Sequence, residues 1–336
     1  MNIVVVGDVH IADVAPSTRK DDYRTTVLNK LQFIADWVNE HDVQAMIFLG
    51  DLFHKKIPFH NSHSMLSQLI DLLNSISCPK YIVAGNHDIN GNMSTFENQP
   101  LNVLIQAGCL TLLDGTKPKI HGGSEFISVE GLPFSISING LPFSPLLDNK
   151  NAGSLYSVNH DPAAKLKISV YHQMILPDGM KFFDHYINFS DLENLDANLI
   201  LCGHYHEGYP GSVIQQNGKY FINPGSITRG TAEQSNFEKS PKFLCLHFSP
   251  DAFTWEEILI PVIPANECFD FTVIEKNKRK KDMHQFMDGL SEMEAQSLST
   301  QEPTGIMNAL RLLGMEARLE PVAQSYLDEA YATFTA

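Results

Sequence analysis

Eight side chains in the first two-thirds of the chain have the types and spacing of a two-metal site. They are Asp8, His10, Asp51, Asn86, His87, His172, His204 and His206. They lie in five motifs, in this order: Gly7-Asp8-Val9-His10, Gly50-Asp51-Leu52-Phe53-His54, Gly85-Asn86-His87-Asp88, Val170-Tyr171-His172-Gln173 and Gly203-His204-Tyr205-His206. Mixed oxygen and nitrogen ligands without thiolate suit manganese, iron or zinc and disfavour calcium. Two such ions about 3.5–4 Å apart lower the pKa of a bound water and clamp the oxygens of a phosphate ester. The expected chemistry is therefore phosphoester hydrolysis.

The candidate ligands divide between the two ions. Asp51 is the best candidate for the bridging carboxylate, because it lies between the other ligand groups in chain order. The remaining ligands form two sets: Asp8, His10 and His206 for one ion, and Asn86, His172 and His204 for the other. A neutral Asn beside imidazoles keeps the ligand charge low, so the ions stay electrophilic.

His87 directly follows a ligand, so it is held near the ions without binding one. We expect it to act as a general acid or to stabilise charge on the phosphoryl group. We expect Asp88 to hydrogen-bond the other ring nitrogen of His87 and to raise its pKa. Each motif alone is more often structural than functional, but five motifs in order favour the metal site.

Most of these motifs follow an apolar run that predicts a strand. The runs cover residues 3–6, 45–49, 81–84, 166–170 and 199–201. Apolar residues at helical spacing predict helices over 24–40, 60–77 and 101–107. Strands that alternate with helices predict a sheet with helices on its faces, and α/β folds place their chemistry at the carboxyl ends of the strands.

The middle of the chain changes character. Short strands are expected at 110–113, 125–129 and 134–138, and later strands at 242–248 and 253–260 close the first domain near Ala265. Residues 140–164 are rich in Asn, Ser, Pro and Gly and predict a long surface loop that faces the substrate.

The C-terminal region differs again. Residues 268–274 alternate like a strand, and 306–313 and 321–334 have helical patterns. Five basic residues are concentrated between the first two of these segments: Lys276, Lys278, Arg279, Lys280 and Lys281. These residues either contact DNA phosphates or form the solvated start of a helix. The apolar stripe of the last helix, which begins at Val322, docks on a partner or packs on its own domain.

Composition narrows the class of protein. The formal net charge is −15, which argues against a phosphate-backbone binder, but two divalent ions would add positive charge where a phosphodiester must lie. Five scattered cysteines give no disulfide framework and fit a reducing compartment. We find no signal peptide and no apolar stretch long enough for a membrane span, so we expect a soluble, cytoplasmic protein with no membrane contact.

The ordered motifs resemble the calcineurin-like metallophosphoesterase superfamily over about residues 1–230. The resemblance implies an α/β class with a two-sheet sandwich flanked by helices. Four details resemble the SbcD-type recombination nucleases, including compact phage members. His54 matches a second active-site histidine, and Asp88 ends its motif as in the nucleases. Gly131-Leu132-Pro133-Phe134 resembles their Gly-x-Pro-Tyr turn, and Asn223-Pro224-Gly225-Ser226 their Pro-Gly-Ser segment.

This resemblance implies roles position by position. The metal ligands would bind two Mn²⁺ ions, with Mg²⁺, Fe²⁺ or Zn²⁺ as alternatives, and His87, His54 and Asp88 would be catalytic. Arg229 would touch a phosphate or hold its loop. The implied domains are a nuclease domain over 1–265, a reduced DNA-capping segment over 266–296, and a helical tail over 304–336 that docks on an SbcC-type SMC-like ATPase. A homodimer through residues 60–110 is also implied.

The leading hypothesis is a DNA nuclease, exonucleolytic on duplex ends and endonucleolytic on single strands. It would be the nuclease subunit of an SMC-like ATPase complex in recombination and double-strand break repair, in a bacterial or phage-infected cytoplasm. The alternative is a phosphodiesterase for small molecules such as cyclic nucleotides. A non-catalytic scaffold is disfavoured because no ligand is missing. A phosphoprotein phosphatase is disfavoured because Asp51 lacks that family's Asp-Arg-Gly continuation.

Overall fold

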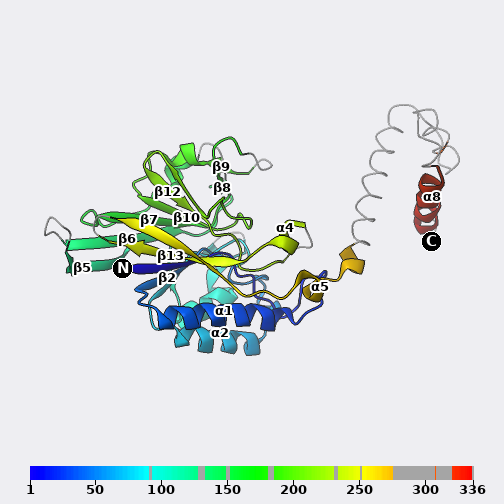
Figure 1. Ribbon diagram of the computed structural model, residues 1–336, viewed down its shortest axis with the longest axis horizontal. Helices are drawn as coiled ribbons and strands as arrows, with labels where there is room; N and C mark the ends of the chain where they lie inside the picture. Colours follow the sequence, from blue (N-terminus) through cyan, green and yellow to red (C-terminus); the bar gives the residue numbers. More distant parts are fainter. Residues whose placement is uncertain are drawn as a thin grey trace. The chain divides into compact units, whose positions relative to one another are not determined.

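The computed structural model divides the chain into two compact units, Met1–Phe269 and Asp270–Ala336 (Figure 1). It describes residues 1–90, 93–127, 133–148, 152–180, 185–230, 234–249, 252–274, 307 and 320–334. Each unit is described by itself below, since the two are not placed relative to one another.

Two six-stranded sheets form the first unit. The first has the order β14-β13-β1-β2-β3-β4, and the second has the order β11-β12-β10-β7-β6-β5. The strands of the first are β1 (Asn2–Val6), β2 (Ala45–Phe48), β3 (Lys80–Ile82), β4 (Thr111–Leu112), β13 (Lys242–Phe248) and β14 (Phe253–Leu259). Those of the second are β5 (Lys119–Ile127), β6 (Pro133–Leu141), β7 (Leu166–Tyr171), β10 (Leu199–Cys202), β11 (Val213–Gln216) and β12 (Lys219–Ile222). A short pair, β8 (Ile175–Leu176) and β9 (Ile187–Asn188), stands apart from both.

Both sheets have a parallel centre, with antiparallel strands at one edge of the first sheet and at both edges of the second. In the first sheet β1 to β4 run parallel, while β13 pairs antiparallel with β1 and with β14. In the second sheet β6, β7, β10 and β12 run parallel, and the edge strands β5 and β11 are antiparallel. Parallel strands bring their carboxyl ends to one edge of each sheet, which is where the candidate ligands follow.

The core forms because successive side chains of a strand point to opposite faces. In β1, Ile3 and Val5 are buried between the two sheets, whereas Val4 and Val6 are buried against the helices. Three helices supply that outer layer: α1 (Tyr23–Glu40), α2 (His63–Ser75) and α3 (Pro100–Gln106). Figure 1 shows α1 and α2 stacked beneath the first sheet. Helices α1 and α2 begin at residues whose side chains accept hydrogen bonds from the first turn, Asp22 and Ser62.

The predicted α/β sandwich of two sheets is confirmed, with an asymmetry in its covering layers. Helices cover the first sheet, whereas the outer face of the second sheet packs on short segments through Tyr156, Phe189 and Phe221. These segments include η3 (Gly153–Tyr156) and η4 (Phe189–Leu192). The remaining short elements are η1 (Pro58–His60), η2 (Met93–Asn98), α4 (Gln234–Glu238) and α5 (Ala265–Cys268).

Two predicted segments differ from the structure. Residues 140–164 are not simply a surface loop, because Leu147, Ala152 and Tyr156 are buried in the core of the second sheet. Residues 268–274 do not form a strand. The chain there is helical at α5 and again over 271–274, where the Asp270 carboxylate accepts hydrogen bonds from the backbone of Thr272 and Val273.

The second unit is described only in part. Helix α8 (Glu320–Phe334) matches the predicted helix over 321–334, with Leu327 3% exposed and Val322 53% exposed. The basic run 276–281 and most of the predicted helix over 306–313 lie outside the described residues. None of the helices in the described ranges combines the length and apolar character that a membrane span requires.

Candidate metal centre

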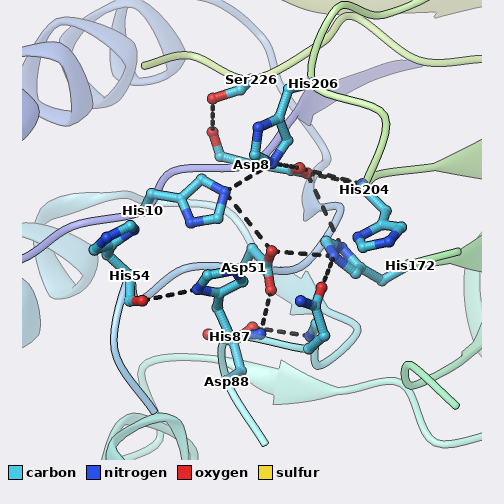
Figure 2. Close-up of polar contacts among 12 residues, drawn as sticks. Asp8, His10, Asp51, His54, His87, Asp88, His172, His204, His206 and Ser226 are labelled. Atoms are coloured by element: carbon cyan, nitrogen blue, oxygen red, sulfur yellow. Dashed lines mark hydrogen bonds and ion pairs between the residues drawn. The ribbon is translucent and has the colours of Figure 1, made fainter. Parts of the chain in front are cut away.

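The candidate ligands meet where strands of both sheets end. Asp8, Asp51 and Asn86 follow β1, β2 and β3 of the first sheet, while His172 and His204 follow β7 and β10 of the second. Figure 2 shows Asp8, Asp51, His172 and His204 gathered around a common centre. The convergence of these candidate ligands follows from the sequence, because strand ends, which are predictable, decide where they lie.

One group of four side chains surrounds a single point. The two histidine nitrogens, His10 Nε2 and His206 Nε2, lie 2.9 Å apart. His206 Nε2 lies 3.1 Å from Asp8 Oδ2, and His10 Nε2 lies 3.6 Å from Asp51 Oδ2. The potential ligand atoms of these four residues all lie within 4.8 Å of one another. This is the set expected for the first ion, with Asp51 as the shared carboxylate.

A second group lies on the other side of Asp51. His172 Nε2 is 3.2 Å from Asp51 Oδ2 and 3.2 Å from Asn86 Oδ1. The ring centroids of His172 and His204 are 5.1 Å apart. Asp51, His172 and His204 offer ligand atoms within 4.8 Å of one another. Asp51 belongs to both groups, which is the position that a bridging ligand needs.

Strained backbone supports this convergence. His10, Asp51 and His204 have φ angles of 52°, 48° and 74°, in the left-handed region that residues other than glycine rarely adopt. Such strain persists only where the surroundings impose it, and it concentrates at functional sites. Two glycines permit the close approach of the loops. A Cβ atom on Gly85 would lie 2.1 Å from Asp51 Oδ1, and one on Gly203 would lie 2.6 Å from Asp8 Oδ1.

Backbone groups and neighbouring side chains orient the ligands. His172 Nδ1 lies 2.7 Å from the carbonyl of Leu49, which leaves Nε2 facing the centre. Ser226 Oγ donates to the carbonyl of Asp8 at 3.0 Å, and Tyr23 Oη donates to the carbonyl of His10 at 3.0 Å. Ser226 was recognised only as part of a family segment, and Tyr23 and Leu49 carried no signal in the sequence, because their roles depend on contacts between distant segments.

The charges of the site are strongly coupled. Burial alone would raise the pKa of Asp8, but His206 and His172 lower it to about 2. Burial alone would likewise raise the pKa of Asp51, but His172 and His10 hold it well below the usual range. Burial would lower the pKa of His172, yet Asp51 and Asp8 raise it to about 10. Burial lowers the pKa of His10 to about 3 and that of His204 to about 4. The centre thus holds two carboxylates that need positive charge nearby.

The residues fit a pair of divalent cations. Two buried polar atoms, Asp51 Oδ2 and His10 Nδ1, have no hydrogen-bond partner, although nearly all buried polar groups normally have one. Carboxylate, imidazole and amide donors converge without any thiolate, a donor set that suits manganese, iron or zinc. When bound, such ions would supply an activated water and neutralise the oxygens of a phosphate ester.

His54 and His87 lie beside this centre. Their rings stack with centroids 5.5 Å apart, and both lie near His10, at 5.7 and 4.9 Å. The backbone N–H of His87 donates to Asp51 Oδ1 at 2.8 Å, and His87 Nδ1 lies 2.8 Å from the carbonyl of His54. Both side chains are therefore placed to reach a substrate at the ions.

The expected hydrogen bond between Asp88 and the His87 ring is wrong. Asp88 is fully buried beneath the site, and its carboxylate accepts from the backbone N–H groups of Gly85, Leu52 and Phe53 at 2.9, 3.3 and 3.0 Å. The carbonyl of His54 takes the ring contact instead. Burial, together with the nearby charge of Asp51, raises the pKa of Asp88 to about 7. Asp88 therefore joins the Asp51 loop to the Asn86 loop and does not face the substrate.

Arg229 is not placed to touch DNA. It is 4% exposed, and its guanidinium contacts the carbonyl of Ile263 and the sulfur of Cys268, while its own carbonyl accepts from Arg19 at 2.6 Å. The alternative that Arg229 holds its loop therefore agrees with the structure. The other candidate DNA contacts, Lys276, Lys278, Arg279, Lys280 and Lys281, lie outside the described residues.

Phe143 is a neighbour of the site that the sequence did not indicate. Its ring centroid lies 5.6 Å from that of His204 and 6.4 Å from that of His172. The residue comes from the segment over 140–164 that was expected to face the substrate. One end of that segment thus packs on the second group of ligands.

Comparisons with known proteins agree with this geometry. The family model described as calcineurin-like phosphoesterase matches residues 1–208. A DNA double-strand break repair protein Mre11 from Methanococcus maripaludis is 23% identical over 301 residues, which cover 86% of this chain and 74% of the relative.

Two solved structures are similar at low identity. A dimetal phosphatase from Danio rerio has a TM-score of 0.48 at 14% identity, covering 78% of this chain and 96% of the other. The calcineurin-like phosphoesterase YfkN from Bacillus subtilis has a TM-score of 0.46 at 13% identity, covering 83% and 97%. Neither value supports an argument about function. The family match spans well over half of the chain and includes both carboxylates and the His-x-His motif. The chain therefore belongs to the calcineurin-like phosphoesterase family, a family of metal-dependent phosphoester hydrolases.

Proposed function

We propose that the protein is a DNA nuclease that hydrolyses phosphodiester bonds with two divalent ions, with Mn²⁺ as the first candidate. The likeness to a DNA double-strand break repair protein carries this proposal, because it covers 86% of the chain and so extends beyond the residues that the family model matches. The resemblance of the motifs around His54 and Asp88 to those of SbcD-type nucleases supports it.

In this proposal each side chain has a distinct task. Asp8, His10, His206 and Asp51 would hold one ion, and Asp51, Asn86, His172 and His204 the other. His87 and His54 would contact the phosphate. The contact between His87 Nδ1 and the carbonyl of His54 orients the His87 ring, so its Nε2 is the atom that would donate a proton to the leaving oxygen. Asp88 would act through the backbone of the two loops it joins, so we now assign it a positioning role.

The surface beside His54 also suits a nucleic acid. The residues that follow His54 include exposed Lys55, and Phe59 is 93% exposed, with Ile57 at 53%. Exposed aromatic side chains stack on unpaired bases, and neighbouring lysines attract phosphates, so this combination is typical of single-strand binding. It offsets locally the net charge of −15, which would otherwise repel DNA.

Degradation of end-labelled DNA tests the proposal. Duplex and single-stranded DNA would be incubated with Mn²⁺ or Mg²⁺, using the wild type, Asp51→Asn and the control Asp36→Asn. Asp36 is an exposed residue of α1 that accepts a hydrogen bond from Gln32, so its substitution should leave activity intact. We expect metal-dependent cleavage that only Asp51→Asn abolishes. Intact DNA throughout, with hydrolysis of cyclic nucleotides or a simple aryl phosphodiester, would instead favour the small-molecule alternative.

The remaining assignments stay predictions. They are the homodimer through residues 60–110, the docking of residues 304–336 on an SMC-like ATPase, the capping role of residues 266–296 and the cytoplasmic location. Helix α8 lies in the proposed docking segment. Co-purification with an SMC-like ATPase, compared between the full chain and a chain that lacks residues 304–336, would test the docking.

A further inference from the structure

Three histidines form a cluster at the side of the candidate metal centre. The rings of His10, His54 and His87 have centroid separations of 4.9, 5.5 and 5.7 Å. Each ring offers one nitrogen, and these three atoms lie within 4.8 Å of one another. We call this cluster the histidine triad. It comes from the three loops that follow β1, β2 and β3, and the first two run side by side, since the backbone N–H of His54 donates to the carbonyl of Ile11 at 2.9 Å.

The spacing of the rings is that of ligands around one ion. A tetrahedral zinc ion lies about 2.0–2.1 Å from each nitrogen, and the ring centre lies about 1.1 Å beyond, so three ligating rings have centroids about 5 Å apart. The ligand pairs of the two expected sites give the same result, with His10 and His206 at 4.7 Å and His172 and His204 at 5.1 Å. The histidine triad therefore needs only small side-chain adjustments to close around a cation.

The nitrogens of the histidine triad are available for such an ion. His10 is 5% exposed, and its Nδ1 is buried without a hydrogen-bond partner, while its Nε2 faces His206 and Asp51. His87 uses Nδ1 for the carbonyl of His54 and so keeps Nε2. Figure 2 shows the His10 ring with one nitrogen toward Asp51 and the other toward His54 and His87. An unpartnered buried nitrogen that faces two further imidazoles points to a ligand.

We propose that the histidine triad is a third cation site, that it prefers Zn²⁺ to Mn²⁺, and that its occupation inhibits hydrolysis. Three imidazole ligands without a carboxylate suit zinc, which binds nitrogen sites more tightly than manganese does. The expected catalytic ions, in contrast, share the carboxylate of Asp51. A zinc ion at the histidine triad would withdraw His54 and His87 from the phosphate, and it would bind Nδ1 of His10 with release of the proton on that nitrogen. The inhibition rests on the proposed function, but the binding of zinc does not.

Counting bound zinc in variants tests this site. The full-length protein would be equilibrated with Zn²⁺ alone, and the ions retained per chain measured for wild type, His54→Gln and His60→Gln. His54 belongs to neither catalytic ligand set, and His60 is an exposed histidine of the same loop. We expect His54→Gln to retain one zinc ion fewer than the wild type, and His60→Gln to retain the same number.

The inhibition is tested separately, with Mn²⁺-loaded protein and an aryl phosphodiester. Added Zn²⁺ should inhibit the wild type and His60→Gln, whereas the residual activity of His54→Gln should be at least tenfold less sensitive. Equal zinc retention in all three proteins would overturn the third site, even if hydrolysis is normal. Loss of one zinc ion in His54→Gln without any hydrolysis by the wild type would instead keep the site and reject the nuclease. His87→Gln, as a second variant, should reproduce the loss, and thermal unfolding confirms that each variant is folded.

Discussion

Binding of metal to the metal-free protein should release a proton from His172. Its Nδ1 lies 2.7 Å from the Leu49 carbonyl, so that nitrogen carries a proton. Its Nε2 faces Asp51 Oδ2 and Asn86 Oδ1, both at 3.2 Å. Burial would lower the pKa of His172, but Asp51 and Asp8 raise it to about 10, so the ring is a cation at pH 7. A metal ion needs the lone pair of Nε2, and the proton there must therefore leave.

The expected number is about one proton per chain from His172, because Asp8, His10 and His204 are already in their binding forms. The pKa of His10 lies at about 3 and that of His204 at about 4, chiefly through burial, so both rings are neutral at pH 7. Asp8, whose pKa is about 2, is ionised. Removing the His172 proton at pH 7 costs about 4 kcal/mol of binding free energy, so metal affinity should rise about tenfold per pH unit between pH 7 and 9.

Calorimetric titration with Mn²⁺ in two buffers of different ionisation enthalpy gives the number of protons released. A metal-bound water with a pKa near 7 would add to the count, so the titration is repeated at pH 6, where that water keeps its proton while His172 still loses one. His172→Gln should show the release reduced by about one proton, and the exposed-site variant His60→Gln should not. No release at pH 6 would mean that His172 is neutral, and the account of the site's charges would fail.

Three further predictions follow from individual contacts. Three backbone N–H groups donate to the Asp88 carboxylate, and in Asp88→Asn the amide NH₂, itself a donor, would face at least one of them. The substitution should therefore destabilise the protein by about 1–3 kcal/mol in thermal unfolding. An unchanged midpoint would reject the positioning role. Arg229→Ala should lower the unfolding midpoint but leave the salt dependence of DNA binding unchanged, and a smaller salt slope would restore Arg229 as a phosphate contact. Phe59→Ala should weaken single-stranded DNA binding by about 1–3 kcal/mol while turnover of an aryl phosphodiester stays constant, and equal losses in both assays would exclude base stacking.

The convergence of the candidate ligands could be predicted from the sequence because each step was local. A buried strand, a glycine and a polar side chain follow one another at Gly7-Asp8, Gly50-Asp51 and Gly203-His204, and parallel strands bring such ends together. The helices were predictable for a similar reason, since α1 and α2 show regular apolar spacing and begin at side chains that cap them.

The errors came from contacts between distant segments and, in one case, from a local helix cap. Asp88 is adjacent to His87 in sequence, but its carboxylate is held by the backbone of Leu52 and Phe53 from another loop. Tyr156 lies in a polar segment, yet it is fully buried because short segments such as η3 and η4 cover the outer face of the second sheet. Residues 268–274 alternate like a strand, but Asp270 starts a helical turn there. In each case the sequence pattern is present, but a tertiary contact or a helix cap determines the local structure.

In the metal-free protein, the negative charges of the candidate ligands are balanced within the site itself. Asp8 and Asp51 are both buried, and their mutual repulsion would oppose folding without a cation. The imidazolium of His172 provides that charge, 3.2 Å from Asp51 Oδ2. Backbone hydrogen bonds between the loops of His10 and Asp51 hold the strained φ angles independently of any ion. We therefore infer that the centre is formed before metal arrives, and that metal binding exchanges a proton for an ion without requiring the loops to fold.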